Sequence, residues 1–222
     1  MTEQTKMKVT EMKNPMHRQT AAHKAVLGMM VLACTAFLLL PGCGKSKPSR
    51  FYVLSPLPPG NAASPQELSL GVGPLKLPDY LLRPQIVKQK NANQLDYAEY
   101  DRWAESLDEN FVRVLAANLS QLIPTDKVHI YPWLEIMSVQ YQLLVEVTRF
   151  GQTEDGSIIL TVYWSVLDHA KRVDLLQRRS RFSRPAPAAG PTDYAALAAG
   201  MSELVGEFSR VAAQALQDIQ RR

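Results

Sequence analysis

Cysteine and histidine are scarce in this 222-residue chain, and their positions exclude several kinds of site. The two cysteines are Cys34 and Cys43, and of the four histidines only His129 and His169 follow Cys43. A disulfide-stapled scaffold or a cysteine metal site needs more cysteine than this. Neither histidine has another histidine at ligand spacing, so we expect surface histidines rather than a metal or general-base site. No Gly-x-Ser-x-Gly elbow is present either, and we expect a protein that is not an enzyme.

Charge is absent from residues 25–40, which form a long apolar run. Residues 1–24 before it carry five lysines and arginines against two glutamates. A basic segment followed by about 15 apolar residues is typical of a secretory signal and is short for a membrane-spanning helix. The run ends in Leu40-Pro41-Gly42-Cys43, which resembles the bacterial lipobox. We therefore predict cleavage after Gly42 and a covalent lipid on Cys43, with no other cofactor.

Three segments follow from this prediction. They are a lipoprotein signal peptide at 1–42, the lipidated cysteine with a short tether at 43–50, and one periplasmic domain at 51–222. Without the signal peptide the formal net charge falls from +4 to +1, because five cations and two anions leave with it. A nucleic-acid partner is therefore not expected, since such binders concentrate positive charge on the folded domain.

The tether and the residue that follows Cys43 bear on location. Residues 44–50 are polar and reach at most about 25 Å when fully extended, so the domain should lie close to the bilayer. The residue after the cysteine is Gly44 rather than aspartate. Because aspartate at this position commonly retains lipoproteins in the inner membrane, we expect delivery to the outer membrane.

Apolar periodicity predicts the elements of the domain. Strands are expected at 51–54, 68–72, 85–90, 94–98, 139–148, 158–168 and 173–182, the last three forming an antiparallel meander. Ser106 and Glu109 match a capping box before a helix that ends at Pro124, and Thr192 is expected to cap a last helix. We predict an α+β fold: a single domain with a mostly antiparallel sheet and two main helices packed on one of its faces.

Two segments could bind a partner. One is a basic strand whose cations are Lys171, Arg172, Arg178, Arg179, Arg181 and Arg184. It could meet anionic lipid headgroups or an acidic protein, although an edge strand protected by charge is favoured. The other is a loop between Pro78 and Pro84. If its side chains are exposed they would contact a partner protein, and if they are buried they belong to the core. The residues considered for a partner contact there are Tyr80, Leu81, Leu82 and Arg83.

The segments 72–87 and 100–115 resemble the ABC-type transport auxiliary lipoproteins of the PqiC type. Pro78-Asp79-Tyr80-Leu81 and Arg102-Trp103-Ala104-Glu105 carry the resemblance, which covers nearly the whole chain after Cys43. It implies a periplasm-facing outer-membrane lipoprotein without catalytic residues. It also implies an MCE-domain partner, inner-membrane transport components, and a homo-oligomeric ring that docks on the MCE conduit. Such a system moves phospholipid or similar lipids across the envelope and maintains membrane integrity.

Two other functions stay open. A structural or assembly lipoprotein could stabilise an envelope complex without handling lipid. An enzyme could also use carboxylates that lie far apart in the sequence.

Replacement of the lipobox cysteine tests the anchor. We expect Cys43→Ala to leave a precursor that is uncleaved or unanchored, because lipidation of the thiol precedes cleavage. Acyl chains contribute about 0.8 kcal/mol per buried CH₂, so two or three of them anchor a protein effectively permanently. Radiolabelled palmitate should enter the wild-type protein alone, and equal labelling of Cys43→Ala would contradict the assignment.

Overall fold

The computed structural model describes residues 27–31, 46–60, 67–185 and 193–221. They belong to two compact units, residues 1–46 and 47–222. In the first unit, residues 27–31 are helical, whereas Gly42 and Cys43 lie outside the described residues. No helix of the described part is both long enough and apolar enough to span a bilayer.

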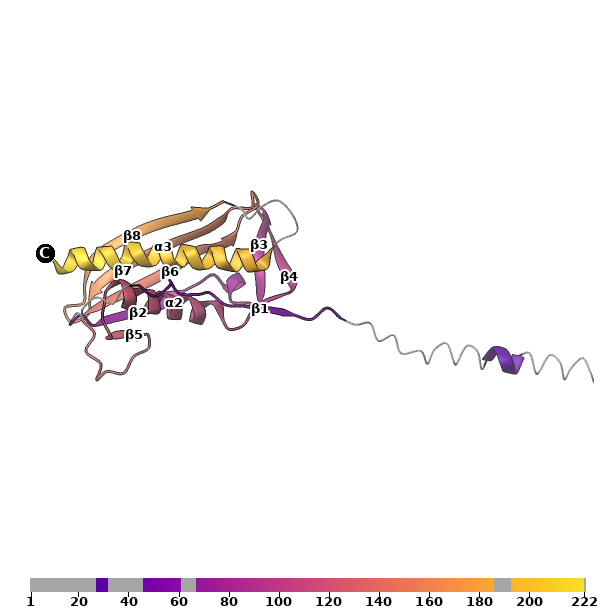
Figure 1. The fold of residues 1–222 in the computed structure, drawn as a ribbon, viewed down its shortest axis with the longest axis horizontal. Coiled ribbons are helices and arrows are strands. Elements are labelled where there is room, and N and C mark those ends of the chain that lie inside the picture. The colour runs from indigo at the N-terminus through magenta and orange to yellow at the C-terminus, as the bar shows by residue number, and fades with distance from the viewer. Residues whose placement is uncertain (1–26, 32–45, 61–66, 186–192, 222) are drawn as a thin grey trace, which may run out of the picture. The chain divides into compact units, whose positions relative to one another are not determined.

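The second unit contains all the strands and long helices of the described part (Figure 1). The strands are β1 Arg50–Tyr52, β2 Leu70–Lys76, β3 Gln85–Asn91, β4 Gln94–Trp103, β5 Val128–Ile130, β6 Tyr141–Gln152, β7 Ile158–Asp168 and β8 Val173–Arg184. The helices are the 3₁₀ helix η1 Asp79–Leu81, α2 Leu107–Leu122 and α3 Tyr194–Gln220. Every predicted strand is present, and η1 and β5 are additions that the sequence did not predict.

Strand β6 lies at the centre of the sheet. Along one edge it pairs antiparallel with β7, and β7 pairs antiparallel with β8, which confirms the meander. Along its other edge β6 pairs in parallel with β2 and then touches β3 at one residue pair, Lys88 and Gln152. β5 pairs in parallel with β2, β4 antiparallel with β3, and β1 in parallel with β4. More residues pair antiparallel than parallel, as predicted.

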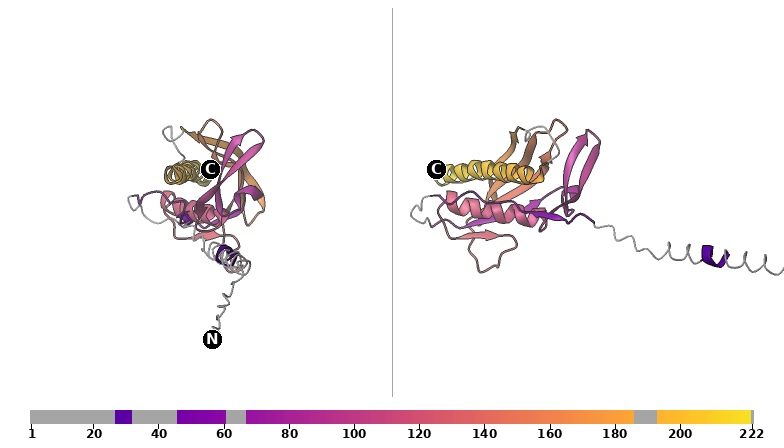
Figure 2. Two further views of the ribbon diagram at one scale, coloured as in Figure 1. Left: turned by 90° about the vertical axis from the view of Figure 1, so that its right-hand side faces the viewer. Right: turned by 45° about the vertical axis from the view of Figure 1, so that its right-hand side comes forward.

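Helices α2 and α3 cover one face of the sheet (Figures 1 and 2). The ring of Phe111 on α2 meets Phe150 of β6 edge to face, with centroids 5.3 Å apart. On α3, the ring of Phe208 meets Trp164 of β7 and Phe182 of β8. These contacts confirm two helices on one face. Within the part of the chain that the structure describes, no helix covers the opposite face of β6, β7 and β8, here called the open face.

Both helices begin near the predicted residues, but their caps differ from the prediction. Ser106 is the N-cap residue of α2, yet its hydroxyl donates to the Asp108 carboxylate, and the capping box with Glu109 is wrong. The hydroxyl is turned toward the Asp108 carboxylate, and no backbone N–H of the helix donates to it. Asp193 caps α3 by accepting from the backbone nitrogens of Ala195 and Ala196 at 2.9 and 3.1 Å. The predicted cap, Thr192, lies outside the described residues, and its role belongs to Asp193.

A buried carboxylate fixes β1, the strand that follows the tether. Asp101 on β4 is 4% exposed and accepts from Nε and Nη2 of Arg50 at 2.8 and 2.9 Å. The Tyr52 hydroxyl donates to the same carboxylate at 2.7 Å. Burial alone would raise the pKa of Asp101, but the hydrogen bonds from Arg50 and Tyr52 outweigh burial and lower it. The ionised form is therefore favoured in the folded state.

Truncation of the central aromatic residue of α2 tests the packing. Phe111 is 0% exposed, so Phe111→Ala should lower the free energy of unfolding by about 3–5 kcal/mol through lost transfer energy and a cavity. Gln121→Ala on the exposed face of the same helix should change it by less than about 0.5 kcal/mol. Thermal and urea melts measure both changes. Similar stability of the two variants would show that the Phe111 side of α2 does not pack in the core.

The Asp101 contact predicts a pH dependence of stability. Since its folded-state pKa is lowered, its contribution is complete above the unfolded value of about 3.9 and is lost as the pH falls through the folded value. Asp101→Asn should therefore be less stable than wild type at neutral pH, and the difference should shrink below about pH 4. Urea melts at a series of pH values measure this, and a pH-independent difference would contradict it.

Candidate functional site

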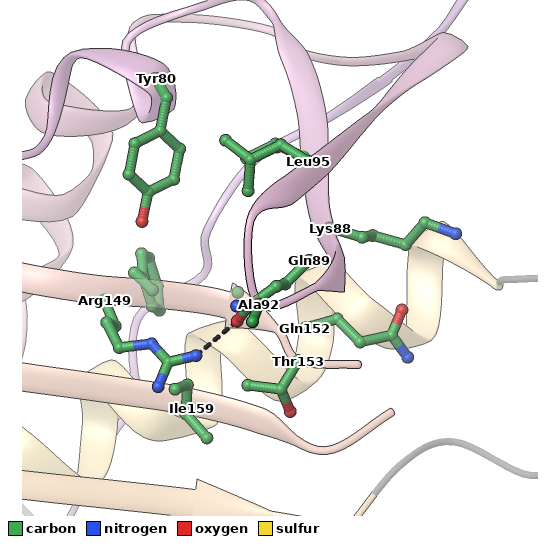
Figure 3. A pocket seen from close by; sticks show the side chains of 12 residues that line it. Tyr80, Lys88, Gln89, Ala92, Leu95, Arg149, Gln152, Thr153 and Ile159 are labelled. Carbon is green, nitrogen blue, oxygen red and sulfur yellow. Dashed lines mark hydrogen bonds between the residues drawn. The ribbon is translucent and has the colours of Figure 1, made fainter. Parts of the chain in front are cut away.

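A recess of about 410 Å³ opens between the β3–β4 hairpin and the open face (Figure 3). It forms because the hairpin meets β6 at one residue pair and then diverges from the main sheet. Gln89 and Leu95 line it from the hairpin, and Tyr80 lines it from η1. Arg149 and Ile159 line it from β6 and β7.

A bulge in β6 brings Arg149 to this recess. The register with β7 shifts between Val147 and Arg149, so that Val147 pairs with Val162 and Arg149 pairs with Thr161. In a regular strand alternation would place Arg149 on the same face as Val147, which is the core face. The extra residue reverses this and puts Arg149 on the open face, as bulges do next to many functional sites.

Two arginines stand on either side of one threonine on the open face. Thr161 pairs with Arg149 on β6 and with Arg181 on β8, so the three side chains form one cross-strand row. Arg149 and Arg181 also line a depression of about 290 Å³ that shares Gln89 and Thr153 with the recess. The recess therefore continues toward β8 past both guanidinium groups.

The other side of the recess is apolar with a single hydroxyl. Leu95 lies beside Tyr80, and the hydroxyl of Tyr80 is directed toward the opposite side, which carries Arg149 and Ile159 (Figure 3). Burial raises the pKa of Tyr80, although Arg149 acts in the opposite sense. Tyr80 therefore stays protonated and can donate a hydrogen bond.

The four residues that were candidates for a partner contact, in the loop between Pro78 and Pro84, differ in their burial. Leu81 is 3% exposed and belongs to the core, so it cannot supply that contact. Tyr80 lines the recess, and Leu82 is 41% exposed. The guanidinium of Arg83 lies over the ring of Tyr97, 5.7 Å from its centroid. Periodicity could not separate Leu81 from Leu82, because one turn of 3₁₀ helix is too short to show a period.

The basic strand contains β8, which among the described strands pairs with β7 alone and is therefore an edge strand. Two of its cations have carboxylate partners: Lys171 lies 3.0 Å from Asp168, and Arg184 contacts Glu203. Arg179 lies over the ring of Tyr163. Arg181 has no ion pair within the described ranges. No pattern in the sequence indicated that Arg149 would stand near it.

A second hollow of about 500 Å³ lies elsewhere on the open face. Leu144, Tyr163 and Arg179 are among its lining residues. It also contains a carboxylate, Glu146, which stands opposite Lys76 in the pairing of β6 with β2. Lys76, Arg178 and Arg179 also line this hollow, so it is basic overall, but its lining comes from the strands of the main sheet alone. The recess is also walled by the β3–β4 hairpin and η1, and it is therefore the better candidate site.

The loop after β5 exposes an apolar surface that was not predicted from the sequence. Its tip is highly exposed, with Ile136 at 88%, and Leu134 beside it is also exposed. Its base is fixed, because the ring of Trp133 packs where a Cβ on Gly71 would lie, 2.6 Å away. Trp133 also meets the ring of His169 at 5.5 Å.

The remaining titratable residues show no metal centre. In the described part of the chain no three histidines, cysteines or carboxylates gather as metal ligands. His169 contacts the side-chain oxygen of Gln142 through Nδ1 at 3.1 Å, and His129 lies on β5. His169 therefore makes a polar and a ring contact near the surface, and His129 lies on a short strand.

Comparisons with known proteins agree on one family and fold. The family described as "ABC-type transport auxiliary lipoprotein component" matches residues 52–213. The chain is 29% identical over 193 residues to the intermembrane transport lipoprotein PqiC of Escherichia coli (strain K12), covering 86% of this chain and 97% of that protein.

Two crystal structures show the same fold. Protein XCC0632 from Xanthomonas campestris superposes with a TM-score of 0.65 at 16% identity, covering 78% of this chain and 97% of that one. An uncharacterized protein superposes with a TM-score of 0.62 at 22% identity, covering 77% and 99% respectively.

Proposed function

This chain belongs to the family of ABC-type transport auxiliary lipoprotein components, and we propose that it is the non-enzymatic outer-membrane subunit of an MCE-type lipid transport system. The proposal rests on the family match, which extends over nearly the whole domain. In this role the domain faces the periplasm from its lipid anchor on Cys43. It docks on the conduit formed by an MCE-domain protein and helps to move phospholipid between the membranes.

The chemistry of the recess supports binding rather than catalysis. Among the described residues that line it, Lys88 and Arg149 are charged and none is a carboxylate. General acid–base catalysis needs a group that gains and loses a proton near the working pH. A guanidinium does not titrate in that range. We therefore assign the site to recognition of a ligand.

The attachment of the tether supports a fixed place near the membrane. The tether leads directly into β1, and β1 is held to β4 by the Arg50, Tyr52 and Asp101 contact. The reach of the domain from its anchor is therefore set by the short tether alone, and this keeps the domain near the membrane. Gly44 rather than aspartate after the lipidated cysteine supports the outer membrane as its location.

Two exposed surfaces can supply the contacts of a complex. Leu82 with Arg83 is one, and the apolar loop with Leu134 and Ile136 is the other. Exposed apolar side chains on a fixed base are suited to protein contacts, because little ordering cost remains to be met on binding. We propose that these surfaces join the copies of a homo-oligomeric ring and the MCE partner.

Co-purification tests the function. The wild-type lipoprotein, recovered from the outer-membrane fraction after mild solubilisation, should carry the MCE-domain protein with it. Leu82→Ser and Ile136→Ser should each lower this recovery or the oligomer size. Their melting should stay near wild type, since exposed substitutions change stability by about 0.5 kcal/mol or less.

A matched substitution in the same loop separates contact from folding. Leu81→Ser should instead lower the melting temperature markedly, because it removes a buried side chain and buries a hydroxyl. If both exposed variants retain wild-type recovery and oligomer size, the contact lies elsewhere. If the wild-type protein carries no MCE-domain protein, the structural or assembly role is favoured instead.

A further inference from the structure

We infer that the recess binds a lipid that carries a phosphate and an acyl chain. The phosphate would lie between Arg149 and Arg181, and the acyl chain would lie against the apolar side chains of Tyr80, Leu95 and Ile159. This inference rests on the proposed function and deepens it, because it names a substrate class and the residues of this chain that bind it.

The charges favour an anion that binds two guanidinium groups. Arg149 and Arg181 stand on the two sides of Thr161, on β6 and β8. Thr161 between them is only 3% exposed. Arginine presents a planar fork of donors that matches phosphate oxygens in pairs. One donor of Arg149 is used by the side-chain oxygen of Gln89, and this contact orients the group at the mouth of the recess (Figure 3).

Two carboxylates lie near the arginines. Asp155 and Glu154 line the depression together with Arg149 and Arg181, but neither is among the residues that line the recess itself. The carboxylate of Asp155 accepts hydrogen bonds from Thr153 and Ser157 of its own turn. Lys88 of the recess forms an ion pair with Asp96 at 3.8 Å. The two arginines are therefore the cations that an incoming anion would meet.

The apolar side explains why the ligand is an amphiphile rather than free phosphate. Leu95 and Ile159 bound the space, and Gly151 beside Ile159 has no side chain to fill it. A volume of about 410 Å³ lies within the range of about 300–1,000 Å³ that is usual for small-molecule sites. An acyl chain there would leave water while its headgroup reached Arg149, and the Tyr80 hydroxyl could donate to an ester oxygen.

Photo-crosslinking in cells tests the inference with the full-length, membrane-anchored protein. A benzophenone amino acid is introduced at Leu95 in cells grown with radiolabelled phosphate. Irradiation should attach a labelled phospholipid, and phospholipase C should remove the label. Free phosphate has no C–H bond to capture and leaves no adduct. The control position is Val173, which is exposed at the start of β8 and lies outside the recess.

Matched double variants test the charges. Arg149→Gln with Arg181→Gln should lower the adduct at Leu95 about tenfold or more, as expected when charge-assisted hydrogen bonds are lost. Arg172→Gln with Arg178→Gln removes the same charge outside the recess and should leave the adduct unchanged. Melting curves of both should match the parent protein, since none of the four residues is buried.

Several results would overturn the inference. The inference fails if Leu95 gives no labelled adduct, if Val173 gives an equal one, or if both double variants lose the adduct equally. It also fails if phospholipase C does not remove the label, or if Leu95 crosslinks to protein alone. Failure of the site is distinguishable from failure of the proposed function. If the adduct is missing but the MCE-domain protein is still recovered, only the lipid site is contradicted. If the adduct forms but the MCE-domain protein is not recovered, only the proposed docking is contradicted.

Discussion

Strand β6 is paired along both of its edges, and a bulge of one residue in it decides what lies on each face of the sheet. On the helix side, Phe150 meets Phe111 of α2. On the open side, Arg149 reaches the recess. In a regular strand these two side chains would exchange faces, which would bury a guanidinium and expose a phenyl ring. Burying an unpaired charge is costly, so the core and the recess depend on the same irregularity.

The proline-rich segment after β1 depends on two buried amides of α2. Prolines lack the N–H that a sheet ladder needs, so the segment at 55–60 cannot continue as a strand. Its remaining N–H groups still require acceptors. Asn110 accepts from the backbone nitrogen of Leu54 at 2.5 Å, and Asn118 accepts from that of Leu57 at 2.7 Å. Asn118 also donates to Ser209 of α3 at 3.0 Å, so one side chain ties the segment and both helices together.

The sequence could predict the elements whose signal is local. Alternation over 139–168 and the three-to-four spacing after Ser106 predicted strands and a helix, since each pattern repeats several times within the element. The position of β2 between β5 and β6 could not be predicted, because parallel partners lie far apart in the chain. The same holds for the caps. Ser106 and Thr192 have suitable side chains, but the choice between neighbouring acceptors depends on local geometry.

The candidate site was harder to predict than the fold. Arg149 reads as a core-face position under strict alternation, and only the bulge makes it a partner of Arg181. Tyr80 was recognised, but within a set that also contained Leu81, and burial divides that set. The recess itself arises from the divergence of the β3–β4 hairpin from β6, which no short stretch of sequence encodes. Local patterns thus define elements, whereas the site is formed where three distant segments meet.

The cations of the domain differ in what they contact, and this bears on ligand binding. Arg50, Lys171 and Arg184 each contact a carboxylate and fix a strand end or a turn. Within the described ranges, Arg149 has an amide as its side-chain partner and Arg181 has no ion pair. An anion could therefore bind at the open face without breaking an ion pair, so its binding would displace mainly water. Exposed ion pairs contribute little free energy on their own. A second guanidinium and an adjoining apolar wall are what would give such a ligand both affinity and orientation.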